Sequence, residues 1–143
     1  MASNNQPQKW GLSENGTDQL TVQQFSAVDL AMNYGTPLHV INQPRLVDTA
    51  ENFRNALKSG YPGTVAVHYP FKCNSVPAVI QSIRRAGCDA EVMTPFELEL
   101  ALHLGFRADQ IIVNGPAKTE SFLRQCLNHR VRLIVIDSTE ELL

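Results

Sequence analysis

The sequence alternates short apolar runs with longer stretches of helical spacing, and this alternation constrains the fold more than any other feature. The apolar runs predict strands, which are Val65–Tyr69, Ala90–Met93, Ile111–Val113 and Leu133–Ile136. The stretches that follow them predict helices at about Val76–Ala86, Pro95–Leu104, Glu120–Asn128 and from Thr139 onward. Repeated strand–helix units with right-handed crossovers give an α/β fold with a parallel sheet, which is either open or part of a barrel.

Residues near the helix ends support this pattern. Thr94–Glu97 and Ser138–Glu141 both have the spacing of a capping box, in which a hydroxyl and a carboxylate accept hydrogen bonds from free N–H groups of the first turn. Gly87 and Gly105 follow predicted helices, at the place where a left-handed residue often ends a helix. Local chemistry therefore predicts the same helix boundaries as the periodicity does.

The leading part of the chain differs from the rest. Residues 1–33 are rich in Asn, Gln, Ser and Gly, which predicts a loose polar segment. A turn and a strand over Leu38–Ile41 then lead to a helix that Asn42 caps, that has Pro44 in its first turn and that ends at Gly60. Residues 34–143 are predicted to form the main domain.

The length limits how much of a barrel the chain can hold. A chain of 143 residues usually forms one domain, but four strand–helix units are too few to close an eight-stranded barrel. The last predicted helix has also barely begun at Leu143. We expect the chain to be the front portion of a longer protein, and a small four-stranded α/β domain is the alternative.

Composition and charge exclude several classes of function. The net charge of −2 comes without a cluster of lysine and arginine, which argues against nucleic-acid binding, and no apolar run is long enough to span a membrane. The amino terminus has no basic, apolar signal segment, and the three cysteines form no Cys-x-x-Cys pair. The four histidines have no metal-ligand spacing. We expect a cytoplasmic protein without a metal site.

Lys72 is the leading candidate for a catalytic residue. It follows the predicted strand Val65–Tyr69, so its amine is expected at the carboxyl end of a strand, where barrels and open α/β sheets place their active sites. A lysine amine can attack carbonyl groups and form Schiff bases with substrates or with pyridoxal phosphate. On this local pattern alone, a solvated loop lysine is the other interpretation.

Two carboxylates and a second lysine lie near the other strand ends. Glu91 lies within a short predicted strand, and Asp89 has the same side-chain parity, so the two compete for one position at the mouth of the sheet. Lys118 lies in the next strand-to-helix loop, whose simpler interpretation is a turn in which Thr119 caps the following helix.

An ordered set of segments resembles the ornithine/diaminopimelate/arginine decarboxylase family, whose members are pyridoxal-phosphate enzymes of fold type III. Tyr34–Val40 resembles the Y-G-T-P-L-x-V opening of the diaminopimelate branch, and Tyr69–Ser75 resembles Y-A-V-K-A-N-S, whose lysine holds the cofactor. Further matches are Gly87–Leu98 to G-x-G-A-D/E-V-V-S-G-G-E-L, Ile111–Lys118 to a strand with an N/G-x-x-K loop, and Ile136–Leu142 to V-D-S-x-x-E-L. The resemblance runs in register from Tyr34 to the end of the chain.

This resemblance implies about the first half of a (β/α)8 TIM barrel of the alanine racemase type, with the strand at Leu38–Ile41 belonging to a second, β-rich domain. It implies that Lys72 binds pyridoxal 5′-phosphate and that Glu91 stands beside the cofactor, where most members have aspartate. Asp89 is the alternative for that cofactor-binding position. The pair Pro70-Phe71 departs from the family pattern, which has small or branched residues before the lysine.

The function implied by the resemblance is decarboxylation of an amino acid of the diaminopimelate, ornithine, lysine or arginine type. The full-length enzyme would be a cytoplasmic homodimer. The chain alone is expected to be inactive, because the family's phosphate-binding and pyridine-nitrogen residues lie further along such chains. Two alternatives stay open. One is a racemase-type or non-catalytic relative with the same barrel, and the other is a small α/β binding module without a cofactor.

Overall fold

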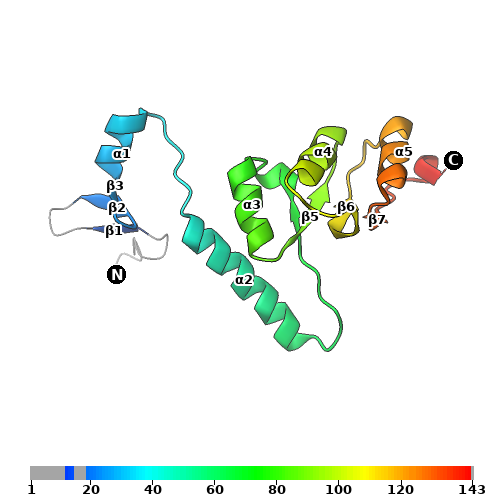
Figure 1. The fold of residues 1–143 in the computed structure, drawn as a ribbon, viewed down its shortest axis with the longest axis horizontal. Helices are drawn as coiled ribbons and strands as arrows, with labels where there is room; N and C mark the ends of the chain where they lie inside the picture. Colours follow the sequence, from blue (N-terminus) through cyan, green and yellow to red (C-terminus); the bar gives the residue numbers. More distant parts are fainter. Residues whose placement is uncertain (1–11, 15–18, 143) are drawn as a thin grey trace, which may run out of the picture. The chain divides into compact units, whose positions relative to one another are not determined.

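Two compact units make up the computed structural model of the chain, which describes residues 12–14 and 19–142 (Figure 1). The division falls between Leu46 and Val47, inside helix α2 (Gln43–Gly60). The first unit contains an antiparallel sheet and the second a parallel sheet. In the described ranges, none of the helices is both long and apolar enough to cross a membrane.

The sheet of the first unit has three strands in the order β1 (Leu12–Glu14), β2 (Leu20–Val22) and β3 (Phe25–Ser26). Gln23 takes a left-handed conformation, with φ 56°, in the tight turn between β2 and β3. Helix α1 (Ala27–Tyr34) follows directly, because Ser26 caps it by accepting a hydrogen bond from the Asp29 N–H at 3.4 Å.

The described residues before Gln43 differ from the expected secondary structure at one strand and hold more structure than their composition indicates. The described part of residues 1–33 contains strands and a helix. A tight turn and a serine cap need only a few residues, so average composition does not reveal them. The strand expected at Leu38–Ile41 is not formed, since its large side chains are exposed and no described strand pairs with it. An extended segment without a neighbouring strand cannot complete the hydrogen bonds of a sheet.

The second unit is built on a parallel sheet of four strands in the order β4-β5-β6-β7, as the alternating pattern predicted. The strands are β4 (His68–Pro70), β5 (Asp89–Val92), β6 (Ile111–Val113) and β7 (Leu133–Ile134). The α-helices that connect them are α3 (Pro77–Arg85), α4 (Pro95–His103) and α5 (Glu120–His129). Short 3₁₀ helices are η2 (Phe71–Cys73), η3 (Ala108–Gln110) and η4 (Thr139–Leu142).

The two faces of this parallel sheet differ in what covers them. Ala90 and Val92 of β5 pair with Ile111 and Val113 of β6, and all four are fully buried in a core with side chains of α3, α4 and α5. The intervening residues point to the opposite face, which we call the open face. By the strand register, the open face carries His68, Asp89 and Glu91 on β4 and β5, and Ile112 and Leu133 on β6 and β7.

The predicted box at Thr94 keeps its hydroxyl bond, and at both predicted boxes the carboxylate bonds to the N–H one residue before the expected one. Thr94 accepts a hydrogen bond from the Glu97 N–H at 3.1 Å, as a cap should. The Glu97 carboxylate, however, accepts the N–H of Met93 at 2.6 Å, one residue before the cap. Glu141 likewise accepts the Asp137 N–H at 3.2 Å. These carboxylates therefore fix the strand ends as well as the helix starts.

A hydrogen bond attaches α2 to the end of α3. The Arg54 guanidinium donates from Nη1 to the Ala86 carbonyl at 2.8 Å. Gly87 follows with φ 80°, which confirms the predicted left-handed helix end. A Cβ at Gly87 would lie 2.6 Å from Arg54 Nη1, so the glycine also leaves room for this contact.

Candidate active site

Lys72 lies in η2, the short turn that connects the carboxyl end of β4 to α3. This is the strand-end position that the sequence predicted. Lys72 is exposed, and within the described part of the chain its amine makes no hydrogen bond or ion pair. The amine is therefore accessible and has no partner that competes with an incoming carbonyl group.

The residues just before Lys72 fix its backbone. Phe71 is 1% exposed, and its ring packs edge-on against Phe106 with the ring centroids 5.9 Å apart. Pro70 ends β4, which has a single neighbour among the described strands, and proline is tolerated in such an edge strand because its missing N–H faces away from the sheet. The pair Pro70-Phe71 thus suits this turn: one residue ends the strand and the other anchors η2 in the core.

Glu91 and Asp89 both project from β5 onto the open face, as their parity predicted. The register places Glu91 opposite Pro70, and Asp89 opposite His68, further from the end of the strand. Each carboxylate is half-buried and accepts a hydrogen bond from an amide on the β6 side: Asn114 Nδ2 lies 3.3 Å from Glu91 Oε1, and Gln110 Nε2 lies 3.0 Å from Asp89 Oδ1. Of the two carboxylates, Glu91 is therefore the one nearer the end of the sheet that bears Lys72.

His68 is a half-buried neighbour of Asp89 whose environment the sequence did not predict. Its Nε2 has no hydrogen-bond partner among the described residues and lies 3.8 Å from Asp89 Oδ2. Burial is the largest influence on the pKa of His68 and lowers it from the usual 6.5, although the charges of Asp89 and Glu91 oppose this change. Burial therefore favours the neutral form of this imidazole.

Lys118 has the opposite environment to Lys72. Its amine is fully buried and donates to Asp137 Oδ2 at 2.9 Å, to Glu141 Oε2 at 3.0 Å and to the Gly115 carbonyl. Burial by itself lowers the pKa of Lys118, but the hydrogen bonds to the two carboxylates outweigh it and raise this pKa above the usual 10.5. The predicted role of Thr119 as a helix cap is confirmed by its 3.3 Å bond to the Phe122 N–H.

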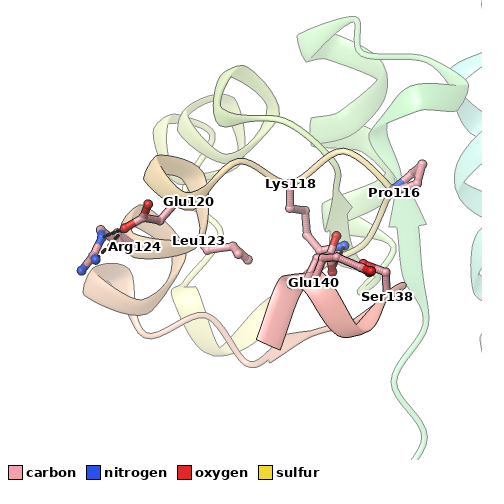
Figure 2. A pocket seen from close by; sticks show the side chains of 8 residues that line it. Pro116, Lys118, Glu120, Leu123, Arg124, Ser138 and Glu140 are labelled. Atoms are coloured by element: carbon pink, nitrogen blue, oxygen red, sulfur yellow. Dashed lines mark hydrogen bonds and ion pairs between the residues drawn. The ribbon is translucent and has the colours of Figure 1, made fainter. Parts of the chain in front are cut away.

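A pocket of about 580 Å³ opens beside Lys118, between the start of α5 and η4 (Figure 2). Its lining includes two basic side chains, and both are already paired. Lys118 is bound to Asp137 and Glu141, and Arg124 lies 2.6 Å from Glu120. The residues that line this pocket therefore offer no unpaired cation to an anionic ligand. Of Lys72 and Lys118, Lys72 is the one whose amine is available.

These features define a class of protein: an α/β chain with an accessible lysine amine at a strand end of a parallel sheet. Residues 44–143 match the family described as pyridoxal-dependent decarboxylase, pyridoxal binding domain. The match covers well over half of the chain, and the chain belongs to this family. The predicted family, the pyridoxal cofactor and the partial TIM barrel are confirmed.

Known relatives extend this assignment. The diaminopimelate decarboxylases of Zymomonas mobilis and Bacillus subtilis are 30% and 33% identical over 129 and 130 residues, each covering 90% of this chain. The chain spans only 30% and 29% of the lengths of those relatives. The crystal structure of diaminopimelate decarboxylase from M. jannaschii in complex with L-lysine matches with a TM-score of 0.81 at 22% identity, over 92% of this chain and 31% of that chain. At that identity the structural likeness shows the fold.

Proposed function

We propose that the whole protein that carries this chain decarboxylates an amino acid by using pyridoxal 5′-phosphate. The observation that carries the proposal is the exposed, unpartnered amine of Lys72 at the carboxyl end of β4, within the family's pyridoxal-binding domain. The names of the relatives favour diaminopimelate as the substrate. The L-lysine bound to the M. jannaschii enzyme agrees with this choice, because lysine is what remains when diaminopimelate loses one carboxylate.

The residues of the candidate active site fit this cofactor. Pyridoxal attaches to proteins through a primary amine, and Lys72 offers one that no described group engages. Lys118 is unsuited to this role because attachment would break its bonds to Asp137 and Glu141. Glu91 supplies negative charge at the same end of the sheet, and Asp89 is the alternative one step further along the strand.

Each of these residues has a distinct task in the proposed reaction. When bound, pyridoxal phosphate supplies an electron sink for the electron pair that loss of carbon dioxide leaves behind. Lys72 would hold the cofactor, and Phe71 would fix the turn from which the lysine extends. Glu91 would stabilise positive charge beside it. Homodimer formation and a cytoplasmic location stay predictions.

The proposal is tested with two measurements on the whole protein. The purified protein should show the near-visible absorption band of a protein-bound pyridoxal, and Lys72→Ala should abolish this band. It should also release carbon dioxide from diaminopimelate faster than from ornithine, lysine or arginine. A band with racemisation in place of carbon dioxide release would indicate the racemase-type alternative. Absence of the band at saturating pyridoxal phosphate would reject the proposed function in favour of a binding module.

A further inference from the structure

The open face carries two hydrogen-bonded carboxylate–amide pairs, whose carboxylates are two residues apart on β5. Glu91 is bonded to Asn114 at 3.3 Å, and Asp89 is bonded to Gln110 at 3.0 Å. The first pair lies at the end of the sheet that bears Lys72, and the second lies one step further away. The two pairs share their chemistry and their strand and differ in position, so they can be compared directly.

The side-chain amide of Asn114 is held in one orientation. The Asn114 backbone N–H donates to the Val92 carbonyl at 2.9 Å, which extends the pairing of β5 with β6 by one residue. Its Oδ1 accepts the Gly115 N–H at 2.8 Å. A side-chain amide has one acceptor end and one donor end, so this bond directs the Nδ2 donor to Glu91.

The conformation of Gly115 makes this arrangement possible. Gly115 has φ 108°, a backbone conformation that residues with a side chain rarely adopt. A Cβ there would also lie 2.8 Å from the Met93 Cε atom, so the end of this flexible side chain would have to move. Asn114 is therefore placed by the strand pairing on one side and by a glycine turn on the other.

We propose that Asn114 is a positioning residue for Glu91. The inference rests on the proposed function, in which Glu91 lies beside the cofactor at a position where the family resemblance implies the shorter aspartate. Glutamate has one more rotatable bond, and holding it in one place costs more side-chain entropy. The amide of Asn114 holds Oε1, which restrains the longer side chain and leaves Oε2 for the positive charge of the bound cofactor.

The first test compares Asn114→Ala with Gln110→Ala in the cofactor-loaded whole protein. Asn114→Ala should lower kcat about tenfold, which corresponds to one lost hydrogen bond to a charged group, with little change in KM. It should also shift the pH midpoint of the cofactor absorbance band. Gln110→Ala, the matched control, should change neither. A shift with Gln110→Ala alone would overturn the inference, because Asp89 would then be the carboxylate beside the cofactor.

The second test does not depend on the cofactor. Urea unfolding of the cofactor-free whole protein is measured for Asn114→Ala, Glu91→Gln and the double variant. We expect the two shifts in midpoint to be less than additive, because each variant weakens the same hydrogen bond. Additive shifts would overturn the inference whatever the spectrum shows. If wild-type protein binds no pyridoxal phosphate, the proposed function fails, and coupled midpoints would still support Asn114 as the residue that positions Glu91.

Discussion

Lys72 and Lys118 lie in the loops that follow β4 and β6, and their surroundings give them different chemistry. Lys72 is exposed and has no partner among the described residues, whereas Lys118 is buried between Asp137 and Glu141. We predict that borohydride reduction of the whole protein with its cofactor, followed by peptide mapping, places the label on Lys72. A label on Lys118, or no label in a protein that binds pyridoxal phosphate, would contradict this assignment.

The sequence predicted where the residues of this site lie along the chain better than it predicted their contacts and burial. Lys72 was placed correctly because its location depends only on where an apolar run ends. Parity alone left Glu91 and Asp89 equivalent, and the pairing of Glu91 with Pro70 was needed to separate them. The buried cluster around Lys118 was missed because Asp137 is 19 residues away in the chain. The only sequence signal for the cluster was the V-D-S-x-x-E-L match, which includes both acidic partners.

At the scale of elements, Lys118 ties the loop before α5 to η4. Replacing it by methionine leaves Glu141, whose side chain is 9% exposed, without its partner. We predict that Lys118→Met lowers the free energy of unfolding of the whole protein by about 3 kcal/mol, at the lower end for a broken buried ion pair because Asp137 is 36% exposed. Urea unfolding at pH 8 measures this cost.

The pH dependence of this cost has a definite sign. The pKa of Lys118 is raised by folding, so its contribution is fully present below the unfolded value of about 10.5 and is lost as pH rises through the higher folded pKa. The difference between wild type and Lys118→Met should therefore shrink only above about pH 10.5. Arg124→Met is the control, because its exposed pair with Glu120 should be worth less than about 1 kcal/mol. Equal costs for the two variants would contradict the role of the buried cluster.

The elements also show where sequence patterns are sufficient. Strand β6 (Ile111–Val113) has the predicted bounds because it lies between two neighbours and its residues are apolar throughout. Strands β4 and β7 are shorter than predicted, since each has one neighbour among the described strands. At Leu38–Ile41 the strand-like pattern has no neighbour among the strands that the structure describes, and no strand forms there. Periodicity predicts which residues can take an extended conformation, but these residues form a strand only where a neighbouring strand can pair with them.

At the scale of the whole molecule, the open face sets the stability of residues 1–143 taken alone. Leu133 is 53% exposed on this face, and Ile136 beyond β7 is 42% exposed. Leaving a large aliphatic side chain in water instead of burying it forfeits about 1.5–3 kcal/mol. A few such side chains therefore represent much of the net stability of an ordinary domain, which is about 5–15 kcal/mol. Strand β4 also has a free edge among the described strands, and free edges promote association.

We therefore predict that residues 1–143, expressed by themselves, aggregate or unfold and have no decarboxylase activity. Calorimetry should show a broad or irreversible transition, and diaminopimelate should release no carbon dioxide. The control is the same measurement on the whole protein, in which later strands of the barrel would cover the open face and complete the cofactor site. A sharp, reversible transition of the 143-residue chain together with turnover of an amino acid would show that the open face needs no further cover.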